Sequence, residues 1–137
     1  FLPPSRIDGA TICDSLIGDG CRIGNGAKIE NSVIGHRMTI GENVTIRDSV
    51  LMGADLYETQ VELKSGAAAE RPPIGIGDDS VVAGAIIDKN CRIGRGVRIE
   101  NCSNTVELQE QGECCIRDGI PIIGKDAVLP DGWKFEN

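Results

Sequence analysis

Two lysines stand at the same position after an aliphatic residue, and their ammonium groups could together bind an anion. Lys89 lies two places after Ile87, and Lys125 lies two places after Ile123. If each isoleucine opens a repeat unit and the two units stack, both ammonium groups project from one edge, with neighbouring strands about 4.8 Å apart. Such a pair would suit a phosphate or a carboxylate. Basic residues that could enlarge the patch are Arg92, Arg95, Arg98 and Arg117. The alternative interpretation is a set of solvated side chains without a ligand.

Two further patterns suggest chemistry. Residues 119–125 have the spacing of a phosphate-binding loop, but Asp126 stands where that loop needs Ser or Thr, and no helix follows, so we reject this interpretation. His36 is the only histidine, so a Ser-His or Cys-His catalytic arrangement would have to be built around it. A corner histidine is also the general base of hexapeptide acyltransferases; the alternative is an exposed turn residue. We assign no catalytic residue.

The cysteines are interpreted as free thiols, because none forms a Cys-x-x-Cys pair and their spacing follows the repeat. Cys114 and Cys115 are adjacent and lie in a segment that interrupts the repeat, which leaves a redox-sensing role as a hypothesis. With one histidine and no paired cysteines, the sequence offers no ligand set for a metal. The six cysteines are Cys13, Cys21, Cys91, Cys102, Cys114 and Cys115.

An internal repeat of seventeen residues defines the elements that position these groups. Residues 10–18, 27–35 and 44–52 match almost letter for letter. Their aliphatic residues are spaced by six, six and five, whereas a helix needs spacings of three and four. Three hexapeptides of this kind make one triangular coil of a parallel β-helix. The aliphatic series runs Ile17, Ile23, Ile29, Ile34, Ile40, Ile46, Leu51 and resumes as Ile76, Val82, Ile87, Ile93, Ile99.

The sequence therefore predicts an all-β fold, a left-handed parallel β-helix of about five to six coils with almost no helix. Composition agrees, since eighteen glycines and four aromatic residues indicate many turns around a slim core. The glycine that follows many of the aliphatic positions is expected to permit a sharp corner. These glycines are Gly18, Gly24, Gly35, Gly41 and Gly94.

We expect one domain, and a fragment of a longer protein, because residues 1–5 contain two prolines and no initiator Met. Two insertions should leave the coil as surface loops, and a short helix is expected at Thr59–Leu63 in the first. The predicted organisation is a leading linker 1–9, first coils 10–51, insertion 52–75, further coils 76–101, insertion 102–115, and a last coil and tail 116–137.

The charge and hydropathy of the chain exclude some partners. A formal net charge of −7 argues against binding to nucleic acid. No long apolar run and no signal-like segment is present, so no membrane association is expected.

Several short segments of the sequence resemble the C-terminal domain of glucose-1-phosphate adenylyltransferase, also called ADP-glucose pyrophosphorylase, of the plant and cyanobacterial type. The resemblance covers nearly the whole chain. It is carried by Phe1-Leu2-Pro3-Pro4-Ser5, Leu51-Met52-Gly53-Ala54-Asp55, Tyr57-Glu58-Thr59, Pro73-Ile74-Gly75-Ile76-Gly77, Ala85-Ile86-Ile87-Asp88-Lys89-Asn90 and Ile116-Arg117-Asp118-Gly119-Ile120.

The resemblance implies that the whole enzyme joins ATP and glucose 1-phosphate into ADP-glucose and pyrophosphate, for starch or glycogen synthesis. The catalytic domain is N-terminal and has no counterpart here, so this piece would be the regulatory and assembly part. Its implied partners are that catalytic domain, homologous subunits in a homotetramer or heterotetramer, and the effectors 3-phosphoglycerate and phosphate. Lys89 and Lys125 match the family's activator-site lysines, with Arg117 as a further candidate. No cofactor is expected in this domain, magnesium is expected for the full-length enzyme, and the compartment would be the plastid stroma or a bacterial cytoplasm.

The chain departs from the family's pattern at Asp118, Pro121 and residues 132–137. Asp118 would put an anion near the proposed anion site, which would either weaken activator binding or mark a modulatory subunit with altered regulation. Three functions remain open at this point: the regulatory and assembly domain, a hexapeptide acyltransferase, and a purely structural interaction solenoid.

Overall fold

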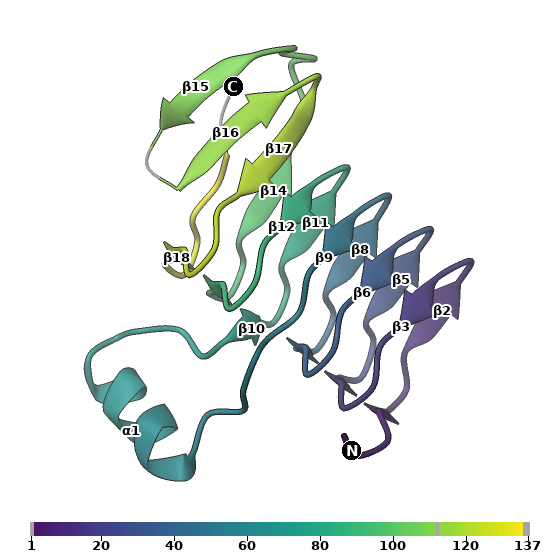
Figure 1. Cartoon of the computed structure of the whole chain (residues 1–137), viewed down its shortest axis with the longest axis vertical. Coiled ribbons are helices and arrows are strands. Elements are labelled where there is room, and N and C mark those ends of the chain that lie inside the picture. Colours follow the sequence, from purple (N-terminus) through teal and green to yellow (C-terminus); the bar gives the residue numbers. More distant parts are fainter. Residues whose placement is uncertain (1, 112, 136–137) are drawn as a thin grey trace.

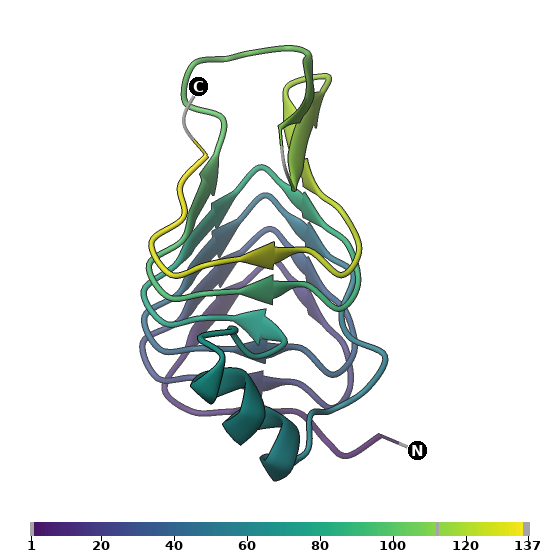
Figure 2. The ribbon, with the colours of Figure 1, turned by 90° about the vertical axis from the view of Figure 1, so that its left-hand side faces the viewer.

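The chain winds into a triangular solenoid whose three faces are parallel β-sheets. The computed structural model describes residues 2–111 and 113–135, and these residues form five complete coils and part of a sixth. Figures 1 and 2 show the coils stacked along one axis, with a helix at one side and a hairpin rising at the C-terminal end. The predicted all-β solenoid and its number of coils are confirmed.

Each coil contributes one short strand to each sheet. The first sheet contains β1 (Arg6–Ile7), β4 (Arg22–Ile23), β7 (Thr39–Ile40), β10 (Gly75–Ile76), β13 (Arg92–Ile93) and β18 (Val128–Leu129). The second contains β2 (Thr11–Cys13), β5 (Lys28–Glu30), β8 (Thr45–Arg47), β11 (Val81–Ala83) and β14 (Arg98–Glu100). The third contains β3 (Leu16–Ile17), β6 (Val33–Ile34), β9 (Val50–Leu51), β12 (Ile86–Ile87), β17 (Ile120–Ile123), β16 (Cys114–Arg117) and β15 (Leu108–Gln111).

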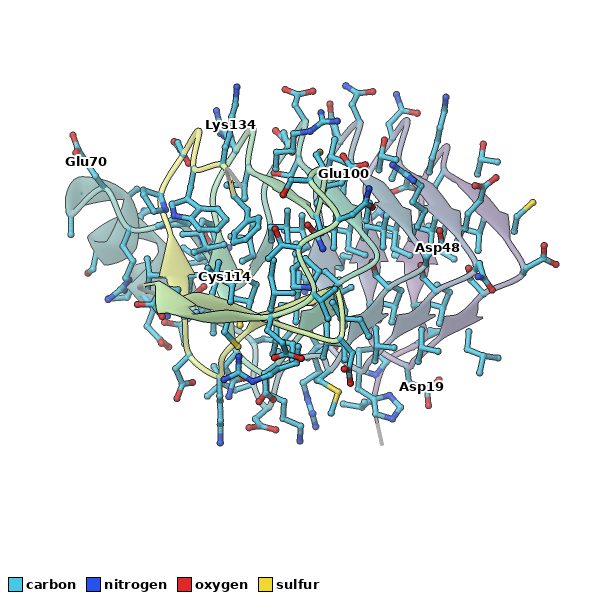
Figure 3. The ribbon with its side chains drawn as sticks, turned by 90° about the horizontal axis from the view of Figure 1, so that it is seen from above. Asp19, Asp48, Glu70, Glu100, Cys114 and Lys134 are labelled. Carbon is cyan, nitrogen blue, oxygen red and sulfur yellow. The ribbon has the colours of Figure 1, made fainter. Side chains whose placement is uncertain are left out.

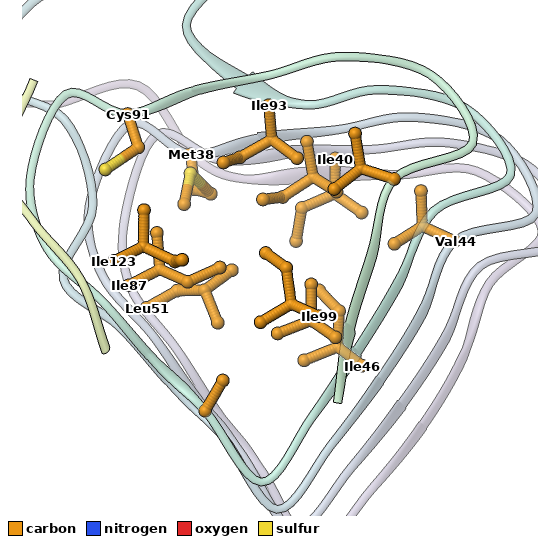
Figure 4. Packing of buried hydrophobic residues seen from close by; sticks show 14 of the residues in the cluster. Met38, Ile40, Val44, Ile46, Leu51, Ile87, Cys91, Ile93, Ile99 and Ile123 are labelled. Carbon is orange, nitrogen blue, oxygen red and sulfur yellow. The ribbon is translucent and has the colours of Figure 1, made fainter. Parts of the chain in front are cut away.

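The parallel register stacks the aliphatic residues into three columns that form the core. In the third sheet Ile34 pairs with Leu51, Leu51 with Ile87, and Ile87 with Ile123, and all four are at most 1% exposed. Looking along the solenoid, Figure 4 shows Leu51, Ile87 and Ile123 stacked along one side of the triangle, with their side chains pointing into it. Ile and Val suit such columns because they lose little rotamer freedom in a pleated interior. Among the described residues, the column residue of the first coil, Ile7, is 45% exposed because no further described coil packs on that side of it.

The glycines after the aliphatic positions have a different role from the one predicted. Gly18, Gly24, Gly35, Gly41 and Gly94 do not adopt positive φ. At Gly24 a Cβ would lie 2.9 Å from the carbonyl carbon of Gly41, so a side chain would collide with the backbone of the next coil. The positive-φ positions are taken by other glycines and, among the remaining residues, largely by Asn and Asp, which tolerate this conformation. At the corners they include Asp14, Asn31, Asn43, Asp48, Asp79, Asn90 and Asp126.

Serines stack at the corner between the second and third sheets. The backbone N–H of Ser32 donates to Ser15 Oγ, that of Ser49 donates to Ser32 Oγ, and that of Ala85 donates to Ser49 Oγ. Each hydroxyl donates in turn to the carbonyl oxygen two residues earlier in its own coil. This ladder satisfies buried backbone N–H groups at a corner where the sheets cannot do so.

The first interruption carries helix α1 (Gln60–Ala68). The helix is longer than the predicted Thr59–Leu63, and Thr59 is its N-cap, in a reciprocal capping box with Glu62. Gly66 is its one buried residue, and the helix projects from the solenoid beside Glu70 (Figure 3). Glu58 holds the base of this segment: it is 4% exposed, accepts from Ile74 N at 2.6 Å, and pairs with Arg92 at 2.9 Å.

The second interruption extends beyond the predicted residues 102–115. Strand β16 pairs antiparallel with β17, and β15 pairs antiparallel with β16, so Cys114–Arg117 belongs to a hairpin and the solenoid resumes only at Ile120. The predicted linker 1–9 also differs, because β1 already pairs with β4. At the C-terminal end Trp133 and Phe135 pack against the core with ring centroids 6.5 Å apart. Residues 136 and 137 of the unusual tail lie outside the described residues.

Candidate anion-binding site at a corner of the solenoid

Lys89 and Lys125 lie side by side at the corner where the chain passes from the third sheet to the first. Strands β12 and β17 pair in parallel with Ile87 opposite Ile123, so the residues that follow stay in register. The backbone N–H of Asp126 donates to Lys89 O at 3.0 Å, which places the turn of Lys125 directly on that of Lys89. The stacking agrees with the phase seen in the sequence. The binding role of the two lysines stays a prediction.

A carboxylate already occupies this corner. Asp55 Oδ1 accepts from Lys89 Nζ at 3.1 Å, and Asp55 Oδ2 accepts from Asn90 Nδ2 at 3.0 Å. The backbone N–H of Asp55 donates to Asn90 Oδ1 at 2.9 Å, which closes a ring between the two residues. The hydrogen bonds from Asn90 and Lys89, together with the charge of Lys125, hold the pKa of Asp55 below its usual value. Asp55 is therefore ionised and bound to Lys89 at neutral pH.

The corner carries further acidic groups. Asp88 Oδ1 accepts from the backbone N–H of Lys89, and Asp126 follows Lys125 in the chain. Beneath them, the pKa of the Cys91 thiol is raised to about 11, chiefly by burial and in addition by the carboxylates of Asp88, Asp126 and Glu113. Two ammonium groups thus share the corner with several carboxylates, and these weaken the attraction for an anion.

The predicted enlargement of the basic patch does not occur. Arg92 turns to Glu58, and Arg98 pairs with Glu100 at 2.9 Å on the second sheet. Arg95 lies at the next corner, between the first and second sheets. Arg117 donates to the carbonyl oxygens of Leu108 and Ile116 in the hairpin. Of the basic residues considered in the sequence, the structure brings together Lys89 and Lys125.

Asp118 is also distant from the lysines, so the expectation that it places an anion beside them is wrong. Asp118 (φ 51°) and Gly119 (φ 78°) form the turn between β16 and β17. The next residue, Ile120, begins β17, and Lys125 comes five residues later, about 15 Å along an extended chain. Arg117 flanks the same turn, at the far end of the hairpin from the lysine pair.

His36 shares the corner column of the lysines. The hydrogen bonds between coils place Asp19, His36, Gly53, Lys89 and Lys125 in successive layers of one edge. His36 is exposed, and its Nδ1 accepts from the backbone N–H of Asp19 at 2.8 Å. That bond makes the neutral tautomer with hydrogen on Nε2 the one that fits. Nothing in the described residues gives His36 an acid or nucleophile as a partner.

The thiols divide into exposed and buried groups. Cys13 and Cys102 are exposed, Cys115 is half-buried, and the other three are buried. Burial raises the pKa of Cys21, and raises that of Cys114 to about 11. Among the described residues all six are free, as the spacing predicts.

The described residues hold no group of three His, Cys, Asp or Glu side chains that could bind a metal ion. In the same residues no helix is long and apolar enough to cross a membrane.

The sequence argument missed Asp55, whose carboxylate pairs with the ammonium group of Lys89. Asp55 lies at the start of the first interruption, where the repeat no longer indicates which residue faces which. It also missed that His36 stands two places after Ile34, the spacing used to pair the lysines. That second signal was available in the sequence.

Triangular coils of hexapeptides define the class of protein as a parallel β-helix. Residues 1–133 match the model of the GLGC left-handed parallel beta-helix domain, and the chain belongs to this family. It is 48% identical over 132 residues to the glucose-1-phosphate adenylyltransferase small subunit, chloroplastic/amyloplastic, of Triticum aestivum. The match covers 96% of this chain and 28% of the wheat protein, so the chain spans about a quarter of that relative.

A solved structure, the acetyltransferase domain of PglB from Neisseria gonorrhoeae, aligns with 98% of this chain and 55% of its own. The TM-score is 0.31 and the sequence identity is 17%. A likeness at this level supports no conclusion about function.

Proposed function

We propose that this chain is the regulatory and assembly part of a plastid glucose-1-phosphate adenylyltransferase, which joins ATP and glucose 1-phosphate into ADP-glucose and pyrophosphate. The observation that carries the proposal is the stacking of Lys89 and Lys125 at one corner of a domain of this family. The similarity to the wheat small subunit, which is chloroplastic/amyloplastic, supports the activity and the location. Catalysis and its magnesium belong, in this proposal, to a separate N-terminal part.

The effectors proposed for the lysine pair are 3-phosphoglycerate and phosphate. Two neighbouring ammonium groups match the charge of a phosphate or phosphate ester. Because Asp55, Asp88 and Asp126 surround them, this wall of the site offers little net positive charge. We therefore expect tight binding only when the catalytic part supplies a second wall that excludes water and adds donors.

The outward face of the third sheet supports the assembly role. Leu16, Val33 and Val50 pair in register on β3, β6 and β9 and are 71%, 41% and 37% exposed. Ile86 and Ile122 continue the row on the next two coils and are half-buried. A continuous row of aliphatic side chains on a sheet face is a feature of surfaces that contact another domain or subunit.

The test is a chimera in which this chain replaces the corresponding 28% of the wheat small subunit. Activation by 3-phosphoglycerate is compared between the chimera and its Lys89→Ala, Lys125→Ala double variant. Saturable activation that the double variant loses supports the proposal. Equal activation in both proteins refutes a role for the lysine pair and leaves the domain as a scaffold.

The same chimera tests the placement of Asp118. Because Asp118 lies at the far turn of the hairpin, Asp118→Ser should leave the half-saturating concentration of 3-phosphoglycerate within about twofold of the parent, since exposed charges that far apart are largely screened. A larger shift would show that the hairpin reaches the effector site in the assembled enzyme.

A further inference from the structure

The two lysines of the corner differ in their ionic partners. Lys89 Nζ is bound to Asp55 Oδ1 at 3.1 Å, and the same carboxylate accepts from Asn90 through its other oxygen. Lys125 makes no ion pair with any residue of the described chain, although its charge acts on Asp55. An anion arriving at the corner therefore meets one available ammonium and one that is already paired.

We propose that Asp55 is a built-in competitor of the anionic ligand: its carboxylate occupies Lys89, and a phosphate or phosphate ester must take that place to bridge both lysines. This inference rests on the proposed function, because it requires the lysine pair to be the anion site. It adds a residue that sets the affinity of the site. Asp55 belongs to the first interruption, so the competitor comes from outside the repeat that positions the lysines.

The geometry allows this exchange without unfolding the segment. The side chains of Lys89 and Asp55 are 46% and 48% exposed, so the ion pair between them is a weak one in water. The backbone N–H of Asp55 is held separately by Asn90 Oδ1 at 2.9 Å. When the carboxylate turns away, this bond keeps the backbone in place, and only side-chain contacts are exchanged.

Removing the charge of Asp55 should therefore strengthen anion binding. Asp55→Asn abolishes the competing ion pair and the repulsion between the carboxylate and the ligand. For an exposed pair we expect the dissociation constant to fall roughly two- to tenfold. In a Lys89→Met background the same substitution should have a smaller effect, because the ammonium released by Asp55→Asn is absent.

Asp48→Asn is the matched control. Asp48 accepts from Asn31 Nδ2 at 2.9 Å, as Asp55 accepts from Asn90, and the substitution removes the same charge. Asp48 lies at the corner between the second and third sheets, away from the edge that carries Asp19 and the lysines (Figure 3). An effect of net charge alone would appear equally in both variants.

The experiment is a calorimetric titration of the chimera with the wheat small subunit, which supplies both walls of the proposed site, with inorganic phosphate and, separately, with 3-phosphoglycerate. Thermal unfolding checks that each variant is folded. Tighter binding in Asp55→Asn, no change in Asp48→Asn, and weaker binding in the Lys89→Ala, Lys125→Ala variant support the inference. Comparing the two probes distinguishes a site that binds any phosphate from a site that also binds the carboxylate of 3-phosphoglycerate.

The failures are distinguishable. If binding depends on the lysines but Asp55→Asn binds as the parent does, the competitor role is wrong and the proposed function stands. If Asp48→Asn gains as much affinity as Asp55→Asn, the effect is general charge and the inference is wrong. If the double lysine variant binds as well as the parent, or none of the proteins binds either probe, both the inference and the site it rests on are refuted for this chain.

Discussion

Glu58 should hold the first interruption to the solenoid, and its removal should loosen that segment more than the core. Its side chain is 4% exposed, and its carboxylate accepts from Ile74 N at 2.6 Å and pairs with Arg92, whose side chain is 18% exposed. Breaking a buried ion pair by removing one partner costs about 3–5 kcal/mol. Arg92 keeps its bond to Pro72 O at 3.1 Å and can reach solvent, so we expect about 2–3 kcal/mol for Glu58→Ala.

Hydrogen exchange measures this cost where it arises. The Ile74 amide loses its acceptor in Glu58→Ala, so its protection should fall about 30- to 150-fold, the ratio that corresponds to 2–3 kcal/mol. Glu58→Gln keeps an oxygen for Ile74 N and should lose less. Glu42→Ala, at an exposed carboxylate, is the control. Unchanged protection of Ile74 in Glu58→Ala would refute the reasoning, since the amide would then be held by something other than this carboxylate.

Three further predictions concern the solenoid itself. Ser49→Ala leaves the backbone N–H of the next coil without its acceptor and should lower the free energy of unfolding by about 1–3 kcal/mol in urea titrations; a change within error would mean that water replaces the hydroxyl. Gly24→Ala forces a Cβ against backbone and should cost about 1–3 kcal/mol, whereas Gly124→Ala, which meets nothing within 4 Å, should be nearly neutral; equal effects would contradict the close-approach argument. The pKa of the Cys91 thiol is raised to about 11, so the unfolded chain loses this proton first as the pH rises. The stability that the buried thiol contributes is thus complete below about pH 9 and declines between pH 9 and 11, by about 2 kcal/mol, and the Cys91→Ala variant should show a shallower decline over that interval.

The sequence predicted the solenoid and the stacking of the two lysines because both follow from one repeat. Once Ile87 and Ile123 occupy equivalent positions, Lys89 and Lys125 must share an edge. The same phase would have placed His36 on that edge. The corner glycines were interpreted wrongly, because a residue without a side chain signals either positive φ or close approach, and only the coil above Gly24 decides which.

The repeat pattern could not predict the hairpin, because here too one sequence signal fits two structures. Cys114–Arg117 contains the same β-forming residues as a coil strand, so composition cannot separate a hairpin strand from a solenoid strand. The antiparallel pairing of β16 with β17 moved Arg117 and Asp118 away from the lysines. Because of this turn, Arg117 does not enlarge the lysine site and Asp118 does not lie beside it, contrary to both predictions.

By itself the sequence determined the triangular coil, its core columns and the edge shared by the lysines, since a hexapeptide period fixes which side chains stack whenever neighbouring coils are in register. Only the tertiary structure decided what meets that edge. Asp55 reaches Lys89 across 34 residues of chain, from a segment without a period. Outside the repeat, contacts depend on how the inserted segment packs against the solenoid. Here Glu58 of the segment pairs with Arg92, and Asp55 bonds with Asn90. Spacing along the chain carries no information about that packing.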